Sequence, residues 1–183
     1  MINQKHGGYR NLRSFQTATL IYDLTVEFCN RYMSYKTNKS YRTYDQMVQA
    51  ARSGRQNIAE GSQASATSKK TEIKLVGVAR ASLEELLIDF EDFLRQRSLP
   101  IWAKDSPQAL AIRNLSYKTN KTYQTYKSYL TEPEKAANCL LCLIHQASFL
   151  LDRQLQTLEK TFIQEGGYSE NLFKKRLLTR SVG

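Results

Sequence analysis

One stretch, residues 133–165, constrains the fold of this chain more than any other. It begins with a proline, contains no other proline or glycine, and ends before the pair Gly166-Gly167. Proline suits the first turn of a helix and glycine its end, so both ends agree with a long amphipathic helix. We expect Thr131 and Glu134 to form a capping box at its start. The apolar residues recur at helical spacing: Leu140, Leu143, Ile144, Ala147, Leu151, Leu155, Leu158 and Phe162.

Three earlier segments show the same apolar periodicity. They predict helices over about 14–33, 44–60 and 68–97, and shorter helices are expected near 107–115 and 169–180. No segment shows the alternation typical of a strand. Four long amphipathic helices predict an all-α fold, an antiparallel up-down-up-down four-helix bundle, in a single domain that covers the whole chain.

Local signals set the expected helix ends. Ser14 is expected to cap the first helix, and Thr43 with Gln46 fits a capping box at the start of the second. Gly61 is expected to stand just past the end of the second helix, where glycine is common. The last segment, 169–180, is expected to dock its leucine and phenylalanine side chains against the bundle.

Two similar low-complexity segments join the predicted helices. SYKTNKSYRTY occupies residues 34–44, and SYKTNKTYQTY begins the second connector, 116–130. Their period of three residues places tyrosines on no single face of a helix or strand, which favours expanded connectors. A nucleic-acid grip remains the alternative, since tyrosine and lysine together can stack on bases and meet phosphates. Deleting 36–41 and 118–127 is expected to leave folding intact.

The positive charge is unevenly distributed. The net charge is +10, and 13 positive charges lie in the two tails and the two repeats, which leaves −3 for the remainder. Residues 52–80 carry six bases and two acids, whereas 84–92 carry five acids and no base. Such a polarised body can attract a phosphate backbone, although an ordinary solvated face or charge matching between subunits would give the same pattern. The candidate nucleic-acid-binding residues are Arg52, Arg55, Lys69, Lys70, Lys74 and Arg80.

A polar motif accompanies these bases. Asn57 and Glu60 lie three residues apart near the end of the second helix. We interpret them as a buried brace that satisfies backbone groups at the turn or reaches Ser82, because buried polar groups need partners. Contact with nucleic acid or another partner is the alternative.

The segments RSGRQNIAEGS at 52–62 and RASLEEL at 80–86 resemble a known bacterial family. Its members are four-helix-bundle proteins encoded in intervening sequences of large-subunit ribosomal RNA genes, together with an accessory protein of diversity-generating retroelements. Residues 138–176 resemble a C-terminal suffix found in one branch. The resemblance implies a homo-oligomer, a pentamer, with a basic surface for nucleic acid and, in the retroelement relative, contact with a reverse transcriptase. The residues that carry the motif are Asn57, Ile58, Ala59, Glu60, Gly61, Ser82, Leu83, Glu85 and Leu86.

Signals for catalysis and metal binding are weak. Cys139, Cys142 and His145 are residue types that bind zinc, but on a helix they fan over roughly 120°, so we expect them to be buried in the core. A di-iron bundle needs two Glu-x-x-His motifs, and the sequence contains none. We therefore expect a protein that is not an enzyme and uses no cofactor or metal.

The remaining expectations concern partners and location. Three cysteines form no disulfide framework, the first residues are too polar for a signal peptide, and no apolar run suits a bilayer. The expected location is cytoplasmic, with no membrane contact. Our main hypothesis is a non-enzymatic homo-oligomer that binds RNA or DNA through the bases around 52–80 and the two tails. The alternative is a protein-interaction scaffold that docks partners through 84–92 and the suffix.

Overall fold

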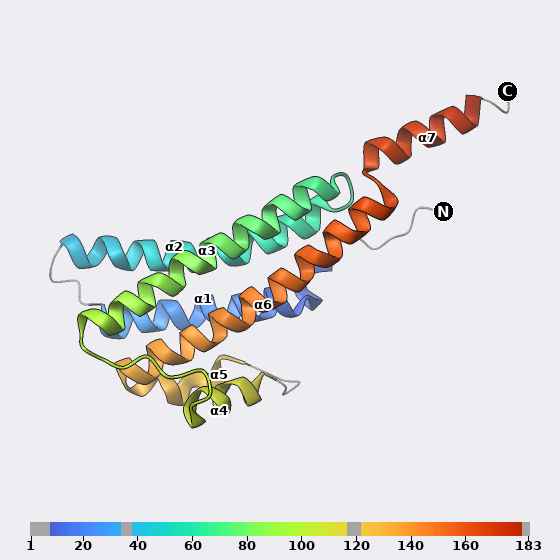
Figure 1. Ribbon diagram of the computed structural model, residues 1–183. Helices are drawn as coiled ribbons and strands as arrows, with labels where there is room; N and C mark the ends of the chain where they lie inside the picture. The colour runs from blue at the N-terminus through green and yellow to red at the C-terminus, as the bar shows by residue number, and fades with distance from the viewer. Residues whose placement is uncertain (1–7, 34–37, 117–121, 181–183) are drawn as a thin grey trace.

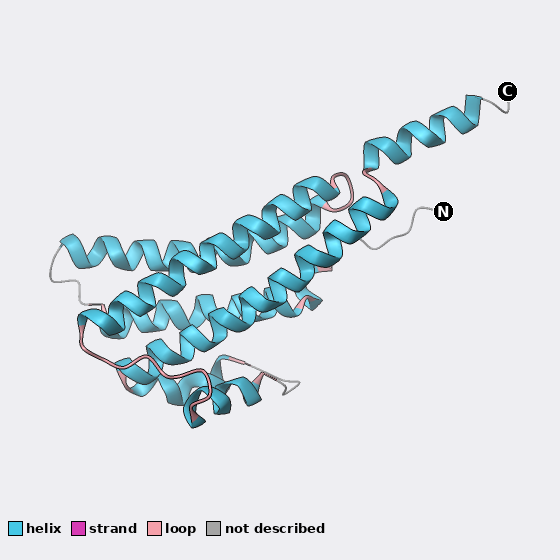
Figure 2. Cartoon of the chain, viewed as in Figure 1, coloured by secondary structure: helices cyan, strands magenta, loops and turns pink. Residues whose placement is uncertain are grey.

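The computed structural model describes residues 8–33, 38–116 and 122–180, which are mostly helical and contain no strand (Figures 1 and 2). This confirms the expected all-α class. None of the helices in these ranges is both long and apolar enough to cross a membrane. In chain order the helices are η1 (Tyr9–Asn11), α1 (Arg13–Tyr32), α2 (Asn38–Ala64), α3 (Lys69–Gln96), α4 (Pro107–Leu115), α5 (Tyr123–Tyr126), η2 (Lys127–Thr131), α6 (Pro133–Glu165) and α7 (Tyr168–Arg180).

The four long helices pack side by side as a helical bundle. α2 lies against α3, α3 against α6, and α1 against both α2 and α6 (Figure 1). Phe28 of α1 lies in the core, with its ring centroid 4.9 Å from that of Phe90 and 4.7 Å from that of Phe93, both edge to face. Met47 of α2 and Leu140 of α6 are also fully buried. The apolar periodicity of each helix thus forms one shared core.

α2 and α3 approach each other closely because two glycines face α3. A Cβ atom added at Gly54 would lie 2.8 Å from Cδ2 of Leu83, and one at Gly61 would lie 3.4 Å from the carbonyl oxygen of Glu72. The expectation that Gly61 stands past the end of its helix is wrong, since α2 continues to Ala64. Gly61 serves the packing of the two helices and does not end one of them.

Two of the expected helix starts also differ. α1 begins at Arg13, and the hydroxyl of Ser14 does not cap it but donates to Oε1 of Gln154 at 2.9 Å. α2 begins at Asn38, so Thr43 and Gln46 lie inside the helix and form no capping box. No proline or glycine stands between 38 and 43 to stop the helix from extending through them.

The start of α6 is set by its proline. Pro133 occupies the first turn, which makes Glu132 the N-cap residue, with no side-chain cap. The expected capping box is therefore wrong. Thr131 donates instead to the carbonyl of Ser128 at 3.1 Å, and Oε1 of Glu134 accepts from the indole of Trp102 at 3.0 Å.

The two connectors are more ordered than expected. Residues 38–44 of the first connector belong to α2, and most of the second forms α5 and η2. Tyr126 is fully buried and Leu130 is nearly so. The hydroxyl of Tyr32 donates to the carbonyl of Leu130 at 2.7 Å, which ties η2 to α1. Residues 34–37 and 117–121 of the repeats lie outside the described residues.

α7 extends beyond the end of the bundle (Figure 1). The expectation that its apolar residues dock against the bundle is wrong. Leu172 is 45% exposed, Phe173 60% and Leu177 50%. Gly166 has a φ of +74°, which L side chains rarely adopt, and it ends α6 before the turn into α7.

Candidate nucleic-acid interface

The turn between α2 and α3 presents two lysines. Oγ of Ser68 caps α3 by accepting from the backbone N–H of Thr71 at 3.1 Å, so the helix begins at Lys69. Lys70 and Lys74 lie one turn apart on α3 and both are exposed. Side chains four residues apart share a helix face, so these two ammonium groups form one positive surface.

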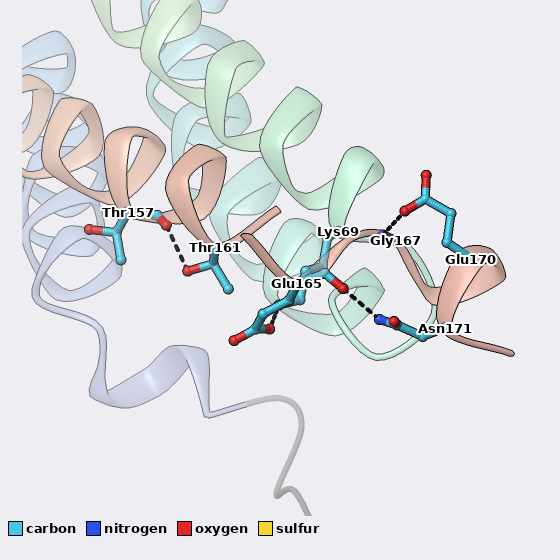
Figure 3. A network of polar contacts seen from close by, with 7 residues as sticks. All are labelled: Lys69, Thr157, Thr161, Glu165, Gly167, Glu170 and Asn171. Carbon is cyan, nitrogen blue, oxygen red and sulfur yellow. Dashed lines mark hydrogen bonds and ion pairs between the residues drawn. The ribbon is translucent and has the colours of Figure 1, made fainter. Parts of the chain in front are cut away.

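The junction between α6 and α7 lies beside this turn (Figure 3). Nζ of Lys69 is 2.7 Å from Oε2 of Glu165, the last residue of α6. The side-chain amide of Asn171 donates to the carbonyl of Glu165 at 3.0 Å, and Oε2 of Glu170 accepts from the N–H of Gly167 at 3.0 Å. These contacts place the start of α7 next to the start of α3.

α7 adds more bases to the same end of the molecule. Lys174, Lys175 and Arg176 are consecutive and exposed, and at 100° per residue they fan over about 200° of the helix surface. Arg180 follows one turn later, and no acid follows Glu170. We refer to Lys70, Lys74, Lys174, Lys175, Arg176 and Arg180 together as the basic end.

Three of the six bases expected at the site make contacts within the chain. Lys69 pairs with Glu165, as described above. The guanidinium of Arg55 lies over the ring of Tyr22, 4.3 Å from its centroid. Nε of Arg80 is 2.5 Å from Oδ1 of Asp152 on α6. These side chains join neighbouring helices, so they are less available to a phosphate than their sequence positions suggest.

Arg52 lies apart from Lys70 and Lys74. Its neighbour Gly54 packs on Leu83, which places Arg52 beside the middle of α3. With a helical rise of 1.5 Å per residue, that level is about 20 Å from Lys70. The structure therefore does not bring the six bases into one cluster, and among them only Lys70 and Lys74 belong to the basic end.

The polar motif is partly a brace between α2 and α3. The amide of Asn57 donates to the carbonyl of Ser53 at 2.9 Å and to its hydroxyl at 3.1 Å. The hydroxyls of Ser53 and Ser82 are 3.0 Å apart, and Ser82 also donates to the carbonyl of Val78. Asn57 thus reaches Ser82 through Ser53, a residue that the sequence analysis did not single out.

Glu60 takes no part in that brace. The expectation that it is buried is wrong, because its side chain is exposed. It points to solvent because the face of α2 that meets α3 is occupied by Gly54, Ile58 and Gly61. Glu60 places a negative charge near the turn.

Glu85 lies in a groove of about 550 Å³ between α2 and α3, together with Gln46, Gln49 and Asp89. Burial raises the pKa of Asp89, and the nearby carboxylates of Asp92 and Glu85 raise it further. Asp92 also pairs with Arg95, with 2.6 Å between Oδ1 and Nη2. The middle of α3 is therefore acidic and unsuited to phosphate.

The cysteine and histidine residues of α6 form no metal centre. Cys139 is buried, and burial raises the pKa of its thiol, as expected for a core residue. Cys142 is half-buried. The expectation that His145 is buried is wrong, since it is exposed on the wall of a cavity. Within the described ranges, no group of three or more histidine, cysteine or acidic side chains is arranged to hold a metal ion.

The sequence hypothesis already includes the bases of the C-terminal tail, but it does not bring them together with Lys70 and Lys74. The bases of α7 are visible in the sequence, but their proximity to α3 depends on the contact between Lys69 and Glu165, 96 residues apart. No sequence signal predicts that pairing.

We compared the chain with known protein families, curated proteins and solved structures. No protein-family model matches the chain, and no significant match is found among curated proteins or solved structures.

Proposed function

We propose that this protein binds RNA or DNA through the basic end. The observation that carries the proposal is the contact of Lys69 with Glu165, which places the start of α7 beside the start of α3, so that the four bases of α7 and the exposed Lys70 and Lys74 belong to the same end of the molecule. Exposed lysine and arginine side chains from α3 and α7 are thus found at this end of the bundle.

The chemistry of the basic end suits a phosphate backbone. Lysine and arginine gain affinity for nucleic acid chiefly by releasing counterions from phosphates, which needs no base-specific geometry. The N-terminus of α3 adds a favourable dipole for anions. We therefore expect binding with little sequence preference.

We further propose the finer architecture and assembly that the sequence suggests. The four long helices would form an antiparallel up-down-up-down bundle, which agrees with the contacts of α1 with α2 and α6 and of α3 with α2 and α6. The resemblance to the ribosomal intervening-sequence and retroelement accessory proteins supports a cytoplasmic, non-enzymatic homo-oligomer, a pentamer in the retroelement relative. A reverse transcriptase would be a partner only by that resemblance.

Salt-dependent binding tests the proposal. Fluorescence anisotropy of a labelled single-stranded RNA should show binding at ~50 mM salt and a steep loss of affinity as salt rises. Absence of binding at that low salt would overturn the proposal. Binding that does not change with salt would exclude phosphate contacts as its source.

A protein-interaction scaffold is the second candidate. The exposed apolar side chains of α7, including Phe173 and Leu177, favour it, because such residues are common at protein interfaces. Replacing both with serine would separate the two functions. A scaffold would lose its partner in co-purification from the native host, whereas binding of RNA through the bases would persist.

A further inference from the structure

A cavity of about 620 Å³ lies between the first half of α6, α4 and the loop that precedes α4. Its volume falls in the range of about 300–1,000 Å³ typical of small-molecule sites. Ile101, Trp102, Leu141 and Phe149 supply apolar walls. Ile101 is 53% exposed and Phe149 59%, so a ligand in the cavity would cover apolar surface that water now contacts.

The wall that carries Trp102 is held in place by α6. The backbone N–H of Trp102 donates to Oδ1 of Asn138 at 2.8 Å, and its indole donates to Oε1 of Glu134 at 3.0 Å. The amide of Asn138 in turn donates to the carbonyl of Pro100 at 2.9 Å. These bonds fix the loop against α6, so the cavity is formed without a ligand.

The polar groups around the cavity are mainly hydrogen-bond donors. Lys104, Arg113 and His145 line it, and no aspartate or glutamate of the described ranges does. Nη2 of Arg113 donates to the carbonyl of Lys104, which keeps the guanidinium at the wall. Lys104 and Arg113 place two positive charges at the lining, and His145 adds an imidazole.

Gln146 gives a second and independent indication. It lines the cavity, and its amide nitrogen is buried with no hydrogen-bond acceptor among the described residues. A buried polar atom without a partner costs about 1–3 kcal/mol. If the side chain turned this amide toward the cavity, a ligand oxygen there would satisfy the donor.

We propose that the cavity binds a small amphipathic carboxylate, with its apolar chain against Trp102 and Leu141 and its carboxylate toward Arg113 and Gln146. A carboxylate only accepts hydrogen bonds when ionised, which matches a lining that offers donors. The apolar walls account for the chain. This site is separate from the basic end and does not depend on nucleic-acid binding.

Trp102 provides the measurement, because it is the only tryptophan in the chain. We expect decanoate, added below its micelle concentration, to change the emission of Trp102 in a saturable way. Decanol and decyltrimethylammonium test the charge preference, and both should bind at least about tenfold more weakly, since a hydrogen bond to a charged group contributes about 1.5–3 kcal/mol. Equal affinity for decanol and decanoate, or no change in emission with decanoate, would overturn the proposal.

Gln146→Leu separates ligand binding from a structural role. Removing an unsatisfied buried amide should leave the thermal midpoint unchanged or raise it, while the affinity for decanoate falls about tenfold. Gln156→Leu, at an exposed position of the same helix, is the matched control and should retain full affinity. Undiminished decanoate binding by the Gln146 variant would contradict the proposed contact.

Discussion

Two glycines of the α2–α3 pair differ in what a side chain would meet. A Cβ at Gly54 would lie 2.8 and 2.9 Å from two atoms of the fully buried Leu83, whereas one at Gly77 meets nothing within 4 Å. We predict that Gly77→Ala stabilises the fold by about 0.5–1 kcal/mol, since alanine favours a helix interior. Gly54→Ala should not show this stabilisation, because its methyl group would overpack against Leu83, which costs about 1–3 kcal/mol.

Urea unfolding of the two variants measures this difference. The Gly54 variant should be less stable than the Gly77 variant by at least about 1 kcal/mol. Equal stability of the two would show that α2 and α3 do not pack as closely as described.

Because the thiol of Cys29 is buried, we predict that the folded protein loses stability at alkaline pH. Burial, with a smaller contribution from Asp89, raises its pKa from 9.0 to about 12. The unfolded thiol therefore ionises at a lower pH than the folded one. The stability from keeping it neutral is complete below pH 9 and is lost as pH rises from 9 to 12, at up to about 1.4 kcal/mol per pH unit.

Cys29→Ala provides the test. The slope of unfolding free energy against pH between about 9.5 and 11 should become less steep in the variant by up to about 1.4 kcal/mol per unit. Cys142→Ala, at a half-buried site, is the comparison. An unchanged slope in the Cys29 variant would contradict burial of this thiol.

Helix ends were the least predictable feature at this scale. The sequence motifs at Thr43 and Thr131 fit capping boxes. Each motif is short, however, and the residues around it decide whether a helix begins there. Around Thr43 nothing breaks the helix, and at Glu132 the fixed geometry of Pro133 sets the start. Gly61 was misinterpreted because close helix packing and helix termination both favour glycine.

At the scale of elements, the second connector is part of the core. Tyr126 is fully buried, and its hydroxyl has no hydrogen-bond partner among the described residues. We predict that Tyr126→Ala destabilises the fold by about 3–5 kcal/mol, as for other large aromatic truncations. Tyr126→Phe should be neutral or stabilising, because it removes an unsatisfied polar group.

Denaturant unfolding distinguishes these outcomes, with Gln124→Ala as an exposed control on α5. The control should stay within about 0.5 kcal/mol of the parent. If Tyr126→Ala were equally mild, the segment would be a plain connector after all, as its low-complexity sequence indicates.

α7 should be dispensable for folding. Among the described residues, hydrogen bonds join it to Glu165 and Gly167, and most of its side chains are exposed. We predict that a chain ending at Gly167 unfolds at a midpoint within a few degrees of the parent. Circular dichroism should show the loss of one short helix only. A large fall in the midpoint would mean that α7 packs on the bundle.

The long helices were predictable because their apolar residues keep the helical spacing over three turns or more. α5, η2 and the orientation of α7 were not, since their placement depends on contacts such as that of Tyr32 with Leu130, 98 residues apart. A repeat of three residues has no periodicity that matches a helix or strand, so its sequence contains no signal for burial of Tyr126.

At the scale of the whole molecule, the charge distribution differs from the one expected. Sequence alone indicated six bases between 52 and 80, yet Arg55, Lys69 and Arg80 contact other helices and Arg52 lies at the level of the middle of α3, away from Lys70. The basic end instead combines Lys70 and Lys74 with α7. The proximity of the start of α7 to the start of α3 could not be derived from the sequence, because it depends on the contact between Lys69 and Glu165.

The central claim is that phosphates contact the basic end, and the salt dependence of RNA binding tests it most directly. We compare the parent with a variant that carries Lys174→Gln, Lys175→Gln and Arg176→Gln, all on exposed α7. The control variant removes equal charge elsewhere, through Arg95→Gln, Arg97→Gln and Lys135→Gln, all exposed.

We predict that the α7 variant binds RNA more weakly and that its slope of log affinity against log salt is shallower by about two to three, near one for each lost phosphate contact. The control variant should keep the slope of the parent. Equal slopes for the parent and the α7 variant, or equal losses in both variants, would contradict a nucleic-acid interface at the basic end.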